Sequence, residues 1–218
     1  MTDSTRYTTA SPMRVGPVTL EGKIIRLEPL TREHADALYA AASFPEIWSW
    51  TGTLPIKSMD DMKAYIELAL SEQAAGRAVP FVIIEQATGE VVGSTRFGAI
   101  SAPDHRLELG WTWLRPDRQR SGANREAKCL MLKHAFDEWG ALRVEIRADA
   151  RNAKSRAAIE RLGGTYEGLL RQHMVVNAGR VRDTVYYSIL DTEWRDPSHP
   201  SHQHALALGI TPRAEKIA

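Results

Sequence analysis

Residues 116–128, PDRQRSGANREAK, join two segments of unlike periodicity. The preceding segment, RLELGWTWL at 106–114, alternates in the period of a β-strand. The following one, CLMLKHAFDEW at 129–139, has a wide apolar stripe at helical spacing. A strand therefore leads into a helix through a turn that is rich in arginine and contains a glycine.

The composition is that of one soluble globular domain. The chain has 218 residues, of which 43% are hydrophobic and 25% charged, and its formal charge of +1 provides no broad field for nucleic acid. The single cysteine, Cys129, rules out an intramolecular disulfide, fits a reducing compartment and is expected to be buried packing. No apolar run approaches the roughly 20 residues of a membrane span, and the N-terminus lacks the apolar centre of a signal peptide. We therefore expect a cytoplasmic protein with no nucleic-acid or membrane partner.

The order of elements predicts an α+β domain. We expect a loose leader at residues 1–17, the domain at 18–194 and a C-terminal tail at 195–218. Within the domain the patterns predict a strand, two helices, a meander of three strands, a helix, a strand, a helix and a final hairpin. Ser58, with Asp61 three residues later, has the spacing of a capping box at a helix start. The histidines of the tail, His199, His202 and His204, are expected to be solvated. No metal site is predicted.

The basic turn has the features of an anion site. A helix N-terminus leaves about four backbone N–H groups unpaired and carries roughly half a positive charge. Gly122 lets a ligand approach the backbone closely, and three arginines add charge-assisted hydrogen bonds, namely Arg118, Arg120 and Arg125. The turn is either a diphosphate cradle or a basic exposed turn. It is neither a Walker loop nor a dinucleotide fingerprint, because the GK[ST] and G-x-G-x-x-G motifs are absent.

Four separated segments now agree in order with one family. The strand at 106–114, the loop QRSGANREA, the strand RVEIRAD followed by a helix with NAKS, and the final hairpin resemble the GCN5-related N-acetyltransferases (GNAT), in their RimJ/RimL-like branch. The resemblance covers about residues 18–194. It implies the GNAT fold, a mixed and mostly antiparallel sheet of about six to seven strands flanked by helices, with a splayed fourth strand. It also implies acetyl-CoA as co-substrate, without a metal.

The resemblance assigns the cofactor-binding residues. In the family the loop holds the pyrophosphate of acetyl-CoA, and Gln119, Gly122 and Asn124 occupy its motif positions here. Asn124 replaces a small residue, and we expect it to cap the helix and to leave a cradle of altered geometry. The splayed strand supplies a backbone N–H to the thioester carbonyl, at about Trp111 to Trp113. The full set is Trp111, Thr112, Trp113, Leu114, Gln119, Arg120, Ser121, Gly122, Ala123, Asn124, Asn152 and Ser155.

The resemblance also provides catalytic candidates for what acyl transfer needs, which is a neutral amine, a donor for the thioester oxygen and a proton for the leaving thiolate. Glu108 on the splayed strand is either the base or a solvent-facing charge. Asp183 resembles an acidic position that faces the acyl acceptor, where it binds the ammonium or shares the base role. Ser155 is the candidate acid, or only a helix hydroxyl after an Asn152 cap. Tyr166 is the rival acid, or only the start of a strand.

The sequence leaves the acyl acceptor open. An α-amine with a pKa of about 7.7–8.0 is far more often neutral at pH 7 than a lysine amine near 10.4, so it demands less of a weak base. This favours a protein or peptide N-terminus, or a small α-amine. The alternatives are a polyamine, amino-sugar or drug-amine acetyltransferase, and a non-catalytic acyl-CoA-binding regulator. A homodimer is also expected, and Trp48 and Trp50 are expected to pack at the wall of the substrate cleft.

Overall fold

A computed structural model describes residues 12–53 and 55–214, and the sheet in this part of the chain has eight strands in the order β1-β2-β3-β4-β5-β6-β8-β7. The pair β5 and β6 is parallel, and the other neighbouring pairs are antiparallel. This confirms the mixed, mostly antiparallel sheet, to which the short β1 adds an edge strand. The strands are β1 Leu20–Glu21, β2 Ile25–Pro29, β3 Val79–Glu85, β4 Val91–Ser101, β5 Arg106–Leu114, β6 Arg143–Asp149, β7 Thr165–Val176 and β8 Arg180–Leu190.

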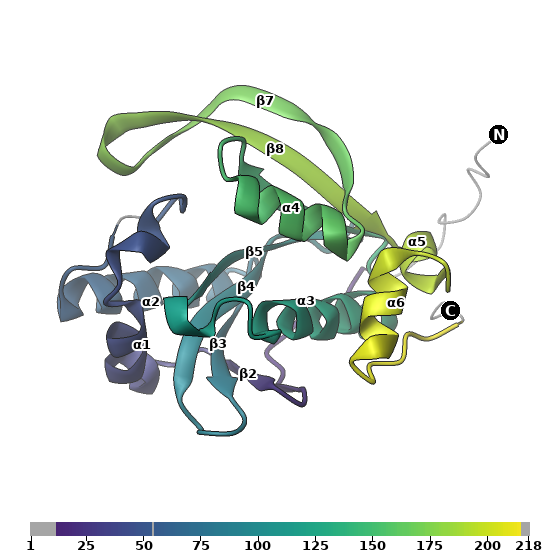
Figure 1. Ribbon diagram of the computed structural model, residues 1–218, viewed down its shortest axis with the longest axis horizontal. Coiled ribbons are helices and arrows are strands. Elements are labelled where there is room, and N and C mark those ends of the chain that lie inside the picture. Colours follow the sequence, from purple (N-terminus) through teal and green to yellow (C-terminus); the bar gives the residue numbers. More distant parts are fainter. Residues whose placement is uncertain (1–11, 54, 215–218) are drawn as a thin grey trace.

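The helices form two layers, one on each face of the sheet (Figure 1). On one face α1 and α2 pack over β3, and on the other α3, α4 and α6 enclose the larger core. A π-helical segment, His134–Glu138, continues α3. The helices are α1 Ala35–Ala42, α2 Met59–Ala74, α3 Ala123–Lys133, α4 Ala153–Leu162, α5 Asp191–Arg195 and α6 Pro200–Ala207.

Alternation along β5 decides which side chains face which layer. Leu107 and Leu109 are buried in the core beneath α3, so Glu108 between them points to the opposite face. On β6, Val144 and Ile146 enter the same core. The charged residues that alternate with them therefore share the face of Glu108.

Local signals at helix starts and turns predicted several elements correctly. The capping box at α2 is confirmed, because the Asp61 N–H donates to Ser58 Oγ at 3.1 Å and the Ser58 N–H donates back to Asp61 Oδ2 at 2.9 Å. The hairpins β3–β4 and β7–β8 are also formed. The tip of β7–β8 arches toward the segment between α1 and α2 (Figure 1), where Asn177 Nδ2 donates to Trp48 O at 2.9 Å.

The expected loose tail is wrong for its described part, residues 195–214. This part contains α6 and packs on the core, because Trp194, just before it, and Ala205 are fully buried. Asp137 holds it in place by accepting from Trp194 Nε1 and from the Arg213 N–H, both at 3.0 Å. His202 is buried rather than solvated, with Nδ1 2.8 Å from Trp194 O. Residues 215–218 lie outside the described residues.

The predicted leader is partly attached to the sheet. Met13 is buried and its N–H donates to Ala102 O at 3.2 Å. Residues 1–11 lie outside the described residues. Within the described ranges, no helix is long and apolar enough to cross a membrane.

Candidate functional site

The parallel pair β5 and β6 opens into a V-shaped splay. The two strands pair at Arg106↔Arg143, Leu107↔Val144 and Glu108↔Glu145, and within the described structure they make no further pairs although both continue. Backbone groups beyond Glu108 on the inner edges of the V are therefore available to a ligand. The splayed strand expected from the sequence is confirmed, with Glu108 at the vertex.

A bulge redirects β5 within the splay. Trp111 and Thr112 together oppose Thr95 of β4, and Trp111, which follows Gly110, has a φ of 51°. Thr112 Oγ1 lies 2.8 Å from Thr95 Oγ1, and Trp113 is buried with its Nε1 donating to a tyrosine hydroxyl on α2. Because these two side chains are engaged within the protein, their backbone is what remains to contact a ligand.

Both following helices begin at the open end of the V, since the carboxyl ends of parallel strands lie at one edge of a sheet. Gly122 is the N-cap of α3 with a φ of 96°, a conformation that favours glycine. A Cβ there would also lie 2.9 Å from Ile24 Cδ1. No protein acceptor in the described ranges pairs with the N–H groups of Gly122, Asn124 and Arg125. These backbone donors at the start of α3 are therefore open to a ligand.

The side chains of the cradle differ in part from the prediction. Arg118 is not available to a ligand, because it is paired with Glu85 at 2.8 Å and with Asp117 at 2.8 Å. Ser121 Oγ accepts from the Ala123 N–H at 3.3 Å and so occupies one donor of the helix start. The remaining polar side chains at 119–125 are Gln119, Arg120, Asn124 and Arg125, of which Gln119 Nε2 donates to Leu114 O at 3.4 Å.

Asn124 does not cap the helix, so that expectation is wrong. It is the second residue of α3, and its Oδ1 is buried without a hydrogen-bond partner among the described residues. Gly122 takes the cap position because the turn requires its positive φ. An unpaired buried oxygen at this place is costly, so a bound donor would relieve it.

Glu126 is a residue that the sequence analysis missed. Its carboxylate is almost fully buried and accepts the backbone N–H groups of Lys23, Ile24 and Ile25, each at 2.8 Å. A Cβ on Gly22 would lie 2.5 Å from this carboxylate, so the β1–β2 turn fits closely over it. Glu126 therefore ties the first turn of α3 to a segment about a hundred positions earlier, which no local pattern reveals.

The first turn of α4 lies on the other side of the V. Asn152 Oδ1 accepts the Ser155 N–H at 3.1 Å, so Asn152 is the N-cap of α4. Its Nδ2 makes no hydrogen bond with any described residue, which leaves the amide free toward a ligand. Ser155 is half-buried in that turn. The cap interpretation of Asn152 is thus confirmed, and it is compatible with ligand contact.

Glu108 lies on the opposite face of the sheet and is only 5% exposed. The interpretation of Glu108 as a solvent-facing charge is therefore wrong. Its carboxylate is bound by Arg147 Nη2, and Arg147 Nη1 in turn donates to the Tyr186 hydroxyl at 2.9 Å. Burial raises the pKa of Glu108 above its ordinary value, although Arg147 opposes this shift. A carboxyl whose proton affinity is raised by its surroundings is chemically suited to accept a proton.

The structure does not bring Asp183 and Tyr166 to Glu108. Asp183 is exposed, and its Oδ1 accepts the Gln172 N–H at 2.6 Å in the bulge of β7. Asp183 lies between Arg182 and Thr184 on β8, whose side chains are on the face of Glu108. Because side chains alternate along a strand, the Asp183 side chain points to the opposite face of the sheet. Tyr166 is 54% exposed against Tyr187. It lies three strand spacings from β5, about 14 Å.

The face of Glu108 holds further charges that were not singled out from the sequence. Asp149 is buried and pairs with Arg180 at 2.7 Å, and Arg182 is buried beside them. The signal was present in β6, where RVEIRAD alternates charged and apolar residues along the whole strand. Such a strand has one charged face, and that face forms the floor of this site.

The two expected wall tryptophans behave differently. Trp48 is buried against Trp113 with ring centroids 5.5 Å apart, which confirms its packing role. Trp50 is more than a third exposed, and the guanidinium groups of Arg151 and Arg180 each lie 5.7 Å from its ring. Cys129 is buried as expected, and burial raises the pKa of its thiol to about 12, which makes it a poor nucleophile.

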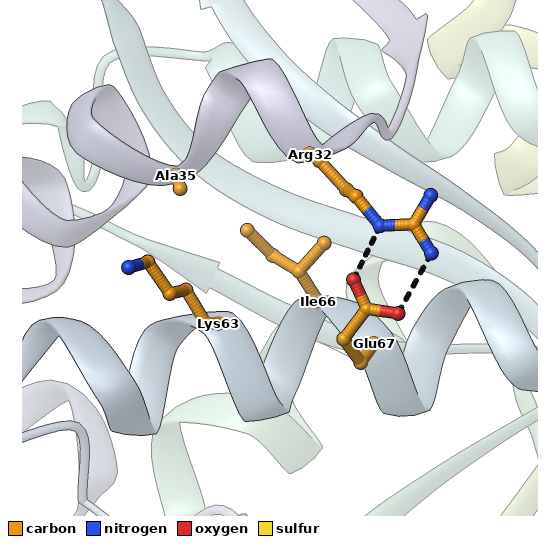
Figure 2. Close-up of a pocket in the computed structure, with 5 residues that line it drawn as sticks. All are labelled: Arg32, Ala35, Lys63, Ile66 and Glu67. Atoms are coloured by element: carbon orange, nitrogen blue, oxygen red, sulfur yellow. Dashed lines mark hydrogen bonds and ion pairs between the residues drawn. The ribbon is translucent and has the colours of Figure 1, made fainter.

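A separate pocket lies between α1 and α2 (Figure 2). Arg32 and Glu67 close it with two hydrogen bonds of 2.5 and 2.8 Å, and both side chains are largely exposed. The two charges neutralise each other and both are exposed to solvent. The lining residues of this pocket therefore include no buried ionisable group comparable to Glu108. Among the described residues no cluster of His, Cys, Asp or Glu could hold a metal ion.

A parallel pair that splays between two helix N-termini defines a class, the GCN5-related acyltransferases. Residues 25–165 match the acetyltransferase (GNAT) domain, so the chain belongs to this family and is an N-acetyltransferase. The crystal structure of a GCN5-related N-acetyltransferase from Brucella melitensis has a TM-score of 0.83 at 31% identity, covering 93% of this chain and 90% of that one.

Two further relatives agree with the RimJ/RimL-like branch. YdaF of Bacillus subtilis (strain 168), named as a candidate ribosomal N-acetyltransferase, is 34% identical over 106 residues, which are 49% of this chain and 57% of YdaF. Mycobacterium smegmatis RimJ, solved in complex with CoA-disulfide, shares the fold with a TM-score of 0.76 at 23% identity, covering 90% of this chain and 97% of that one.

Proposed function

We propose that the protein transfers an acetyl group from acetyl-CoA to a primary amine by direct attack in a ternary complex. The observation that carries this is the splay, which has two helix N-termini on one face and the buried Glu108 on the other. A thioester held in the V would be open to an amine from the face of Glu108. The family membership and the complex of RimJ with CoA-disulfide support the choice of acetyl-CoA.

On the cofactor face, the open N–H groups at the start of α3 are suited to the diphosphate. Gly122, Asn124 and Arg125 would donate from the backbone, and the side chains of Arg120 and Arg125 would add charge. The backbone of Trp111 to Trp113 is suited to the thioester carbonyl, and the free amide of Asn152 to the pantetheine chain. We expect no metal in this reaction.

On the other face, Glu108 accepts a proton from the amine, directly or through water. The amine nitrogen bonds to the thioester carbon, and the carbonyl oxygen becomes an oxyanion that backbone N–H groups of β5 stabilise. When the carbon–sulfur bond breaks, the Ser155 hydroxyl hydrogen-bonds to the thiolate or relays a proton to it. Asp183 and Tyr166 remain weaker candidates for these roles, because neither lies beside Glu108.

For the acyl acceptor we propose the α-amine of a protein or peptide N-terminus, or of a small molecule. YdaF's name supports a protein substrate by analogy. We also propose a cytoplasmic location, a catalytic unit at residues 18–194 and a homodimer. Exposed apolar side chains along the β7–β8 hairpin support the dimer: Leu169, Leu170, Val175 and Val181. Sedimentation at high micromolar concentration tests it.

Release of free thiol from acetyl-CoA tests the activity across N-terminal peptides, polyamines and aminoglycosides. We expect turnover with at least one α-amine, and mass spectrometry of the product identifies the acetylated nitrogen. Tight CoA binding without turnover on any amine would instead favour an acyl-CoA-binding regulator. The second enzymatic alternative, a polyamine or amino-sugar acetyltransferase, predicts that polycations are the best substrates.

A further inference from the structure

Arg182 occupies an unusual setting on the face of Glu108. It is only 9% exposed, and its Nε is buried without a hydrogen-bond partner in the described ranges. Its Nη1 lies 4.0 Å from the place that a Cβ on Gly52 would take. The guanidinium is therefore enclosed between β8 and the loop that follows Trp48. That loop is fixed in place, because Asn177 at the hairpin tip donates to Trp48 O at 2.9 Å.

The carboxylates nearest to Arg182 are already paired with other arginines. Glu108 pairs with Arg147, and Asp149 pairs with Arg180 at 2.7 Å. Burial lowers the pKa of Arg182, and Arg147 and Arg180 lower it further, whereas Asp149 and Glu108 raise it without restoring the ordinary value. Arg182 thus lacks a counter-charge of its own. Burial of an uncompensated guanidinium is costly unless a ligand supplies that charge.

A second arginine strengthens the positive balance of this face. Arg96 on β4 is 4% exposed, with a buried Nε that has no partner among the described residues. The rings of Tyr65 and Trp111 lie 5.4 and 5.3 Å from its guanidinium carbon and offset part of its charge. Arg182 has no such ring contact in the described structure. The face as a whole is therefore poorly suited to a polycation such as a polyamine.

We propose that Arg182 binds a carboxylate of the amine substrate. This inference rests on the proposed function and narrows its substrate class to amines that carry a carboxylate, either a free amino acid or a peptide with an acidic side chain at its N-terminus. The planar guanidinium fork matches a carboxylate in two parallel hydrogen bonds. The ammonium end of the same molecule lies toward Glu108. Two opposite charges at two points of the site then orient the amine toward the thioester.

Two matched pairs of amines test the proposal in acetyl-CoA turnover. Alanine is compared with alaninamide, and the amidated tripeptide Asp-Ala-Ala with Asn-Ala-Ala, so that each pair differs in one carboxylate. For each pair, kcat/KM of the acid is divided by kcat/KM of the amide, in the wild type and in Arg182→Met. The intrinsic reactivity of the amine cancels in the comparison of the two proteins. The pair that responds shows whether the carboxylate comes from an amino acid or from an acidic side chain.

We expect Arg182→Met to lower the acid-to-amide ratio by about 10- to 100-fold in one pair, mainly through KM. Arg182→Lys should retain part of the preference, because it keeps the charge without the fork. Arg106→Met is the matched control, since Arg106 lies at the closed end of β5 with an exposed side chain, and its ratio should equal that of the wild type.

An unchanged ratio in Arg182→Met for both pairs overturns the proposal while leaving the acetyltransferase activity intact. Absence of turnover on every amine counts against the proposed function instead, and calorimetry on the CoA-saturated protein then decides about Arg182. The acid of at least one pair should bind more tightly than its amide to the wild type but not to Arg182→Met. Equal affinities within both pairs reject the site.

Discussion

The first turn of α3 and the vertex of the splay each bury a glutamate, but in opposite ways. Glu126 accepts three backbone N–H groups from the β1–β2 turn. Glu108 has one arginine as its partner, and burial raises its pKa. A carboxylate whose oxygens are fully satisfied by backbone groups fastens the fold, whereas one that is desolvated with a single partner can still exchange a proton. Both glutamates are buried, so burial does not distinguish the structural role from the catalytic one. The hydrogen-bond partners of each carboxylate do.

The largest expected effect is on stability, at Glu126. Glu126→Ala leaves three N–H groups without their acceptor and opens a space beneath Gly22, so the free energy of unfolding should fall by about 3 kcal/mol or more. Urea denaturation followed by tryptophan fluorescence measures it. Glu138→Ala is the control, because its side chain is 40% exposed and pairs only at the surface with Arg213. A loss below 1 kcal/mol would show that water replaces the carboxylate, and the contrast with Glu108 would weaken.

The next effect is on turnover, at Glu108. Glu108→Gln keeps the shape but cannot accept the proton, so turnover at pH 6.5 should fall about 100-fold. The raised pKa means that wild-type activity is lost as the pH falls through a value above the ordinary one for glutamate, since only the carboxylate acts as base. The defect of Glu108→Gln should shrink as the pH approaches the pKa of the amine. Wild-type turnover of Glu108→Gln at pH 6.5 would assign the base role to bound water or to Asp183.

The cradle differs from both glutamates, because its function depends on the backbone. Gly122→Ala strains a φ of 96° and brings a Cβ to 2.9 Å from Ile24 Cδ1, so CoA affinity should fall about tenfold. Gly140→Ala is the matched control, since Gly140 also has a positive φ of 69° but a Cβ there meets nothing within 4 Å. Calorimetric titration with CoA should show equal affinity for Gly140→Ala and the wild type. Equal losses in both variants would mean that the strain acts through stability and not through the cradle.

Local sequence patterns predicted the parts of this molecule that depend on neighbouring residues. The capping box of Ser58 and the Asn152 cap need only a few adjacent positions. At the start of α3 the sequence analysis chose Asn124 as the cap, whereas the structure has Gly122 there. The splay came from the family resemblance. Glu126 was missed because its partners lie about a hundred positions earlier, and Arg182 because its lack of a counter-charge appears only after the pairs on its face are known. The prediction of a loose tail was wrong because the segment has few apolar residues in its sequence. It is held on the core by Trp194 and by hydrogen bonds to Asp137, which lies far away in the sequence.

The smallest effect separates Ser155 from the helix that carries it. Asn152 caps α4 through the backbone N–H of Ser155, so Ser155→Ala removes the hydroxyl and leaves the cap intact. Stability should therefore change by less than about 0.5 kcal/mol, and any loss of turnover reports on the hydroxyl alone. If the hydroxyl assists the leaving thiolate, turnover should fall about tenfold or less at every pH between 6 and 9, because an alcohol does not titrate there and water substitutes for it in part. This flat profile distinguishes Ser155 from Glu108, whose defect depends on pH.

Ser155→Cys, which restores a weak donor of similar size, should recover part of the rate. If Ser155→Ala turns over like the wild type while Asn152→Ala weakens CoA binding, the first turn of α4 contacts the cofactor without taking part in the chemistry.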